Sequence, residues 1–282
     1  MTAKIISGQE VSNSIKEKLK LEVLELSKEG VVPKLTVILV GNDPASQSYV
    51  KGKEKTSAEI GIISEIIRME ESTTQEKLLS EIDRLNNDNS VNGLLVQLPL
   101  PKHIDEKAVI NAINPVKDVD GFHPVTVGRM MIGDDSYLPC TPYGIIELIK
   151  YTGTDIKGKH AVIVGRSNIV GKPVSILLLR EDATVTICHS KTKNIKEITK
   201  QADILIAAVG KPKMITKEYL SPGVIVIDVG TNLVDGKWVG DCDFEEISKI
   251  ASYITPVPGG VGPMTRTMLI KNTIEAARRM ND

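Results

Sequence analysis

A short apolar run that ends in a glycine turn constrains the fold of this chain more than any other feature. His160–Val164 is strand-like, and Gly165 ends it. Gly171 and Pro173 then precede apolar residues with helical spacing. A strand, a tight glycine turn and a helix start bring backbone N–H groups and a helix N-terminus against a phosphate. The spacing departs from G-x-G-x-x-G, so the turn alone is equally compatible with a purely structural βα connection.

The next strand pattern, Ala183–Cys188, carries information about the cofactor. In a βαβ dinucleotide unit this strand end meets the adenosine ribose, and NAD enzymes usually place Asp or Glu there to bind the 2′-hydroxyl. Here the strand is followed by His189–Thr192, which contains no acid, and Arg166 on the glycine turn adds a positive charge. These residues favour NADP, which carries a 2′-phosphate. The alternative is that Arg166 and Lys191 are solvated surface charges.

Apolar runs alternate with amphipathic helical patterns along the chain, which predicts the α/β class. The first half has helical patterns at 11–26, 43–61 and 78–85 and strand patterns at 35–40 and 93–98. The second half has strand patterns at 160–164, 184–188, 203–208 and 224–228. A rigid, glycine-rich segment, Thr255–Pro263, precedes a final helix. We expect two α/β domains with parallel sheets, the second a Rossmann-like dinucleotide-binding domain, and a cleft between them.

Composition and charge exclude several classes of function. The formal net charge of −1 provides no field to attract nucleic acid or a membrane, and an aromatic content of 3% argues against base-stacking surfaces. The three cysteines are scattered and show no metal spacing with one another or with the four histidines, so we expect no metal and a reducing, cytoplasmic compartment. No apolar run resembles a signal core or a membrane span.

Tyr49 and Lys53 are the first candidates for chemistry. They lie four residues apart on the predicted helix at 43–61, so they share one face. A lysine beside a tyrosine and near an apolar strand can act as a proton-transfer group. The alternative is a lysine that extends over the tyrosine ring with its ammonium in water. Lys51 and Lys55 point elsewhere and are interpreted as solvated charges.

Gln97 and Asp120 are the next candidates. Gln97 lies at the carboxyl end of a predicted strand, where ligands of open α/β sheets gather. A buried amide needs partners, so Gln97 either bonds the backbone or reaches a site group such as Lys53. Asp118 and Asp120 face one way only if their segment is extended. Asp120 could hold an amide-like edge of a ligand with two hydrogen bonds, or it could cap the turn at Gly121.

Five motifs occur in order along nearly the whole chain: Tyr49–Lys53, Val96–Pro101, Lys117–Pro124, Gly165–Pro173 and Pro256–Thr265. Together they resemble the methylenetetrahydrofolate dehydrogenase/methenyltetrahydrofolate cyclohydrolase family of the bacterial FolD type. The chain departs from the family pattern at two places. Val125-Thr126-Val127 stands where asparagine commonly follows His-Pro, and Arg266 stands where a small apolar residue is usual. The second departure alters the shape or charge of the folate-side loop.

The resemblance implies a role for each motif. Lys53 would be the proton-transfer group of the cyclohydrolase step, tuned by a hydrogen bond with Gln97, while Tyr49 would orient the folate and Asp120 would grip the pterin. The loop Pro258–Thr265 would close over the substrate. The implied substrate-binding residues are Tyr49, Val50, Lys51, Gly52, Lys53, Val96, Gln97, Leu98, Asp120, Pro258, Gly259, Gly260, Val261 and Gly262. The implied cofactor-binding residues are Gly165, Arg166, Ser167, Ser190 and Thr231.

The implied function is a two-step reaction. NADP-dependent oxidation converts 5,10-methylenetetrahydrofolate into 5,10-methenyltetrahydrofolate, and hydrolysis then gives 10-formyltetrahydrofolate. The methenyl cation is resonance-stabilised, so hydride loss needs positioning more than acid–base help. Hydrolysis needs attack by water and proton transfer, the work for which Lys53 is placed. The alternatives are a dehydrogenase of another small substrate and a non-catalytic NADP-binding module, neither of which needs Lys53.

The resemblance also implies an organisation of the chain. Residues 1–140 and 258–282 would form a folate-binding catalytic domain, and residues 141–257 a Rossmann-like NADP-binding domain. The partners would be tetrahydrofolates, with no nucleic acid and no membrane, and the enzyme would be a cytoplasmic homodimer.

Overall fold

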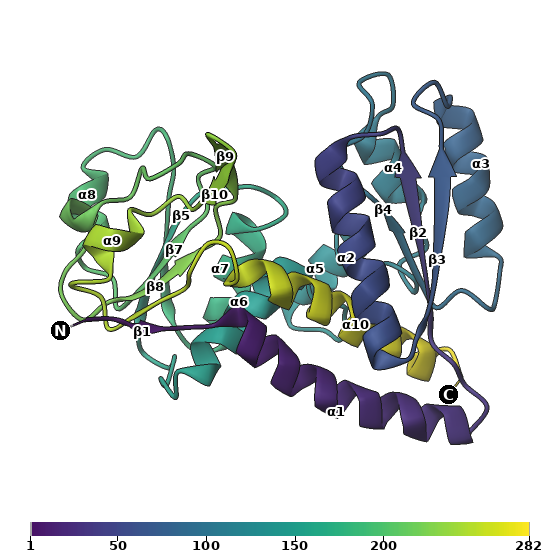
Figure 1. Ribbon diagram of the computed structural model, residues 1–282, viewed down its shortest axis with the longest axis horizontal. Coiled ribbons are helices and arrows are strands. Elements are labelled where there is room, and N and C mark those ends of the chain that lie inside the picture. The colour runs from purple at the N-terminus through teal and green to yellow at the C-terminus, as the bar shows by residue number, and fades with distance from the viewer. Residues whose placement is uncertain (1, 282) are drawn as a thin grey trace. The chain divides into compact units, whose positions relative to one another are not determined.

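The computed structural model describes residues 2–281, which form two compact units, each with a parallel sheet of its own (Figure 1). Unit 1 contains residues 2–13 and 139–265, and unit 2 contains residues 14–138 and 266–281. These bounds differ from the expected domain bounds at two places, because residues 2–13 and 258–265 belong to unit 1. The first residues join unit 1 because strand β1 (Lys4–Ile5) pairs in parallel with β11 (Tyr253–Ile254).

Unit 2 is built on a three-stranded parallel sheet in the order β3-β2-β4. Helices α2 and α3 lie on opposite sides of this sheet (Figure 1). Apolar side chains of α3 and α4 pack with those of β2 and β4 in one buried cluster. The elements of this unit are β2 (Lys34–Val40), α2 (Pro44–Ile60), β3 (Ile63–Met69), α3 (Gln75–Asn86), β4 (Gly93–Val96), α4 (Glu106–Ala112) and α5 (Pro124–Ile132), with most of α1 (Gly8–Lys28) and α10 (Val261–Arg279).

Helix α2 has the termini that its sequence predicts. The Asp43 carboxylate accepts the Ser46 N–H at 2.7 Å, and Pro44 occupies the first turn, where its missing N–H costs nothing. Gly61 ends the helix with a φ of 94°, which a residue with a side chain rarely adopts. The helix therefore starts and stops at fixed points, and this sets the direction of every side chain on it.

Unit 1 is built on a six-stranded sheet, in the order β1-β11-β8-β7-β5-β6, with every neighbouring pair parallel. Strands β5, β7 and β8 are apolar and almost completely buried, as expected for a sheet covered on both faces. The remaining elements are α6 (Cys140–Tyr151), β5 (His160–Val164), α7 (Gly171–Arg180), β6 (Thr184–Cys188), α8 (Ile195–Thr199), β7 (Ile204–Ala207), η1 (Lys217–Tyr219), β8 (Ile225–Asp228), β9 (Asn232–Val234), β10 (Lys237–Val239) and α9 (Phe244–Ile247).

Two details differ from the sequence interpretation. A small antiparallel hairpin, β9–β10, follows β8. The final helix begins at Val261, inside the segment expected to be a rigid, glycine-rich stretch before that helix. Pro263 stands in its first turn, where proline is well tolerated. Within residues 2–281, no helix combines the length and apolar character needed to cross a bilayer.

Candidate active site

The centre of the candidate site in unit 2 is a hydrogen bond between Lys53 and Gln97. The Lys53 ammonium donates to the Gln97 side-chain oxygen at 2.9 Å, and the Gln97 amide nitrogen donates to the Leu98 carbonyl at 2.6 Å. Gln97 therefore bonds both the backbone and the lysine, the two partners considered from the sequence. Lys53 is only 8% exposed. Burial of a primary amine this deep calls for a fixed acceptor, which the Gln97 oxygen supplies.

The rest of the Tyr49–Lys53 motif divides between surface and core. The Tyr49 side chain is 42% exposed, so its ring is available to a ligand on the face of α2 that it shares with Lys53. Lys51 is exposed, as expected of a solvated charge. Val50 is fully buried and Val96 nearly so, and both belong to the core. A ligand would therefore meet these two residues through the main chain alone.

The Asp118–His123 segment forms a turn and not the extended stretch considered from the sequence. Asp118 is 2% exposed, and its carboxylate accepts the N–H groups of Phe122 at 3.2 Å and His123 at 2.8 Å. Asp118 thus anchors the turn around Gly121, which has a φ of 75°. Burial raises the pKa of the Asp118 carboxyl to about 6. Sequence reasoning missed this role, although an acid four residues before a turn N–H is a recognisable signal.

Asp120 lies on the turn that Asp118 holds. It is half-buried and lines a small cavity of about 10 Å³ together with Asp118 and with apolar walls that include Leu98 and Phe122. A carboxylate beside such walls is well suited to a flat ligand edge that presents N–H donors, because hydrogen bonds to a charged acceptor strengthen away from water.

Arg266 packs on helix α2 at Gly52. A Cβ on Gly52 would lie 3.0 Å from the Arg266 Cδ and 3.6 Å from one of its terminal nitrogens, so the glycine makes room for the guanidinium. Arg266 is half-buried, and within residues 2–281 it enters no ion pair. The departure from the family pattern therefore places a positive charge beside the helix that carries Tyr49 and Lys53.

The predicted loop residues Pro258–Gly262 belong to a tightly folded segment of unit 1. A Cβ on Gly260 would lie 2.5 Å from the Pro256 carbonyl oxygen, and a Cβ on Gly8 would lie 1.6 Å from that of Gly260. Gly259 has a φ of 101°. Val261 and Gly262 already form the first turn of α10. Such close backbone packing explains why glycines are concentrated here.

The glycine turn of unit 1 has the close backbone approach that a dinucleotide turn requires. A Cβ on Gly165 would lie 2.1 Å from the Ala208 carbonyl oxygen, and one on Gly171 would lie 2.4 Å from that of Gly165. The Ser167 hydroxyl accepts N–H groups at the start of α7, from Val170 at 3.2 Å and Gly171 at 3.3 Å. These contacts leave Arg166 and Ser167 exposed at the mouth of the turn. The turn therefore fits a cofactor phosphate.

The five predicted cofactor residues lie at one edge of one sheet. Gly165, Arg166 and Ser167 follow β5, Ser190 follows β6, and Thr231 follows β8. These strands are parallel, so their carboxyl ends share an edge, where ligands of open α/β sheets bind. Ser190 and Thr231 are exposed there.

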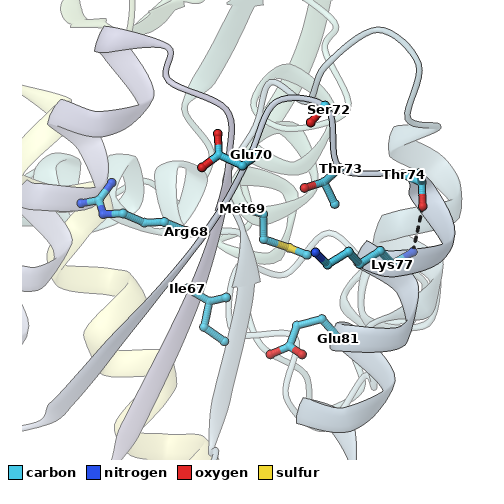
Figure 2. A pocket seen from close by; sticks show the side chains of 9 residues that line it. All are labelled: Ile67, Arg68, Met69, Glu70, Ser72, Thr73, Thr74, Lys77 and Glu81. Carbon is cyan, nitrogen blue, oxygen red and sulfur yellow. Dashed lines mark hydrogen bonds between the residues drawn. The ribbon is translucent and has the colours of Figure 1, made fainter.

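A second pocket, of about 490 Å³, contains none of the predicted site residues. It lies between the end of β3 and the start of α3 in unit 2. Figure 2 shows Lys77 and Met69 directed toward each other and Arg68 extending to the other side of the strand. The Thr74 hydroxyl accepts the Lys77 backbone N–H at 3.3 Å and caps the helix. Glu70 and Lys77 are exposed, as ordinary surface charges are, and we assign this pocket no chemistry.

Comparisons with known proteins identify the family. Residues 6–120 match the tetrahydrofolate dehydrogenase/cyclohydrolase catalytic domain, and residues 139–281 match the NAD(P)-binding domain of the same family. The chain belongs to the tetrahydrofolate dehydrogenase/cyclohydrolase family. It is 62% identical over 280 residues to the bifunctional protein FolD of Bacillus anthracis, an alignment that covers 99% of this chain and 98% of the relative.

Solved structures of this family have the same fold. The bifunctional FolD enzyme of Campylobacter jejuni superposes with a TM-score of 0.96 at 49% identity and covers 98% of this chain and 99% of its own. The Trypanosoma brucei enzyme, solved with NADP and an inhibitor, gives a TM-score of 0.94 at 40% identity and covers 99% of this chain and 98% of its own. The two-domain α/β fold and the bifunctional dehydrogenase and cyclohydrolase activity expected from the sequence are thereby confirmed.

Proposed function

We propose that this chain oxidises 5,10-methylenetetrahydrofolate with NADP and hydrolyses the methenyl product, with Lys53 as the proton-transfer group of the hydrolysis. The observation that carries the assignment is the 2.9 Å hydrogen bond from the buried Lys53 ammonium to Gln97, on the helical face that also bears Tyr49. The hydrogen bond fixes the amine in one place. A folate that packs on the Tyr49 ring would place its one-carbon bridge within reach of this amine.

Lys53 has a defined task in the hydrolysis. Water adds to the methenyl carbon and gives one proton to Lys53, which accepts it in its neutral amine form. Lys53 returns this proton to N5 as the bond from the carbon to N5 breaks, and the remaining hydroxyl proton is released to solvent, which leaves the formyl group on N10. The hydrogen bond to Gln97 holds the Lys53 Nζ in place for both transfers.

The oxidation relies on positioning. When bound, NADP supplies the acceptor for the hydride that leaves the methylene bridge. Asp120 holds the pterin through its N–H edge, and Tyr49 packs on the ring system next to it. Neither residue gains or loses a proton in this step. Pro258–Gly262 contributes main-chain contacts to the folate, in keeping with the glycine content of that segment.

NADP is proposed over NAD because of the residues that follow β6. Ser190 and Lys191 are exposed, no acid lies among His189–Thr192, and Arg166 is exposed on the neighbouring turn. These donors suit a 2′-phosphate, and no carboxylate there would bind the ribose hydroxyl of NAD.

Arg266 is proposed to meet the anionic end of the folate. A tetrahydrofolate carries glutamyl carboxylates at the end opposite the pterin, and Arg266 lies at Gly52, one helical turn from Tyr49. A guanidinium binds a carboxylate with two parallel hydrogen bonds, so this residue can select the tail of the substrate.

Two further proposals rest on the family resemblance: that the enzyme is a homodimer and that it works in the cytoplasm with tetrahydrofolates as its partners. Light scattering of the purified protein at several concentrations tests the first, with a mass twice 30.7 kDa as the expected result.

One assay tests the function as a whole. The absorbance of methenyltetrahydrofolate is followed with purified protein, with and without NADP. With methylenetetrahydrofolate as the substrate, the methenyl band is expected to form only when NADP is present. With methenyltetrahydrofolate as the substrate, the band is expected to decay without NADP. A dehydrogenase of another substrate forms no band, and a non-catalytic NADP-binding module binds the cofactor and changes nothing.

A further inference from the structure

Two buried carboxylates in unit 1, Asp228 and Asp241, hold the loops at the cofactor edge of the sheet. Asp228 is the last residue of β8 and is 3% exposed, and Asp241 follows the β9–β10 hairpin and is 0% exposed. Among residues 2–281, no side-chain cation forms an ion pair with either carboxylate. Both are satisfied by N–H groups, almost all of them in the main chain.

Asp241 fixes the loop that follows β7. One carboxylate oxygen accepts the N–H groups of Val209 at 2.6 Å and Gly210 at 2.9 Å. The other accepts the Lys211 N–H at 2.9 Å and the Asn232 side-chain amide at 2.9 Å. Three consecutive backbone amides thus converge on one side chain, which sets the path of this loop.

Asp228 in turn fixes Asp241 and the loop that follows β8. One of its oxygens accepts the N–H groups of Gly230 at 3.0 Å and Asp241 at 2.9 Å, and the other accepts that of Cys242 at 2.9 Å. A Cβ on Gly230 would lie 2.3 Å from the Asp241 Cγ, so only glycine allows this approach.

The loops held in this way reach the cofactor residues. Ala208, next to Val209, supplies the carbonyl oxygen that lies against Gly165 of the glycine turn. Thr231 is the residue after Gly230 and lies directly before Asn232. The pair therefore shapes the backbone on both sides of the site while its own side chains stay buried and out of reach of any ligand.

We propose that Asp228 and Asp241 are positioning residues for the cofactor: they hold the 209–211 and 229–232 loops in the shape that binds NADP, and they have no part in the hydrolysis step. This inference rests on the proposed function, because it needs unit 1 to bind NADP and the hydrolysis to run on residues of unit 2. A change in Asp228 or Asp241 should then alter NADP binding and leave the hydrolysis step unchanged.

The test uses Asp241→Asn in the full-length protein. The asparagine amide presents an NH₂ where one carboxylate oxygen accepted two N–H groups, so the hydrogen bonds from the loop to that oxygen are lost. The side chain keeps its size. The dissociation constant of NADP, measured by calorimetry without folate, is expected to rise at least about tenfold, the effect of losing one charge-assisted hydrogen bond. The hydrolysis of methenyltetrahydrofolate is expected to stay within about twofold of wild type.

Asp203→Asn is the matched control. Asp203 also accepts a backbone N–H, that of His160 at 2.8 Å, but it lies at the amino end of β7, at the opposite edge of the same sheet. Its variant should leave NADP affinity unchanged. Should Asp241→Asn fail to fold, Asn232→Ala removes one bond to Asp241 and a longer one, of 3.4 Å, to the Val239 carbonyl. This variant is expected to weaken NADP by a smaller factor, about two- to fivefold.

Two results would overturn the inference. One is unchanged NADP affinity in folded Asp241→Asn or Asn232→Ala. The other is a parallel loss of NADP affinity, hydrolysis and thermal stability, which would mark the pair as merely structural. A wild-type protein that binds no NADP would instead overturn the proposed function, so the two failures are distinguishable.

Discussion

The Lys53 ammonium donates a hydrogen bond to the Gln97 side-chain oxygen at 2.9 Å, across 44 positions of sequence. The bond joins the middle of α2 to the residue directly after β4. The bond therefore orients the amine at the carboxyl end of β4.

Lys53→Met should abolish most of the cyclohydrolase activity. General acid–base help contributes roughly 10²–10⁴-fold, and methionine fills the space of the lysine stem without a proton to transfer. The hydrolysis of methenyltetrahydrofolate is the decisive measurement. Lys55→Met, which changes an exposed lysine of the same helix, is the control and should keep wild-type activity. Hydrolysis at a near wild-type rate by Lys53→Met would remove the lysine from the mechanism.

Asp120→Ala should weaken folate far more than NADP. The carboxylate lines the small cavity next to Phe122 and Leu98 and is proposed to hold the N–H edge of the pterin. Losing charge-assisted hydrogen bonds of about 1.5–3 kcal/mol each raises the folate dissociation constant by tenfold or more. Calorimetric titration with each ligand separates the two effects. Equal losses for both ligands would point to a structural role for Asp120.

Arg166→Ala combined with Ser190→Ala should erode the preference for NADP over NAD mainly by weakening NADP. One charge-assisted contact to the 2′-phosphate accounts for about tenfold, since 1.4 kcal/mol is a factor of ten. Steady-state kinetics with both cofactors measures the ratio. If Arg166 contacts the pyrophosphate, its single replacement weakens both cofactors alike. Equal use of NAD and NADP by the wild-type enzyme would contradict the specificity assignment itself.

Arg266→Val should raise KM for the folate substrate about tenfold with little change in kcat, because the guanidinium is proposed to bind the glutamyl tail. A matched substrate supplies the control. Methenyltetrahydropteroamide, in which a neutral carboxamide replaces the glutamate, has no carboxylate at this end, so wild type and variant should hydrolyse it with the same KM. A variant that loses equally on both substrates would show that Arg266 acts through its packing on Gly52 and not through its charge.

Asp118→Asn should change how stability depends on pH. Burial raises the pKa of Asp118 to about 6 from an unfolded value of 3.8, so between these values the folded state binds the proton more tightly. Lowering the pH from 7 to 5 therefore stabilises the folded protein through this group by about 1 kcal/mol. Urea unfolding at both pH values should show wild type gaining that amount relative to the variant. A gap that stays constant, or that moves the other way, would mean that the turn N–H groups outweigh burial.

Much of the architecture was readable from local patterns. Asp43 and Gly61 mark the ends of α2 because capping is a property of a few neighbouring residues. The glycine turn at Gly165 predicted the cofactor edge for the same reason. The pairing of β1 with β11 was not predicted, because each strand has only two residues and their partners lie almost the whole chain apart.

The candidate site residues stay predictions, and the residues that support them were mostly not foreseen from the sequence. Lys53, Gln97 and Asp120 were visible as polar residues next to apolar strands and turns. Asp118 and Asp241 were not singled out for the work they do, because it depends on which backbone N–H groups the fold brings to them. The Gly52–Arg266 contact joins residues far apart in sequence, and only the fold reveals it.

The discontinuous make-up of both units bears on how the protein is made on the ribosome. Unit 2 lacks its last helical segment until residues 266–281 emerge, although the rest of it, residues 14–138, has been synthesised long before. At about 5–20 residues per second, the intervening segment 139–265 takes on the order of ten seconds to appear. During that time Gly93 of the nascent sheet lacks its packing contact with Thr273 of α10, which has not yet been synthesised. The growing chain thus carries an incomplete core during nearly half of its synthesis, and in this interval it most needs protection by chaperones.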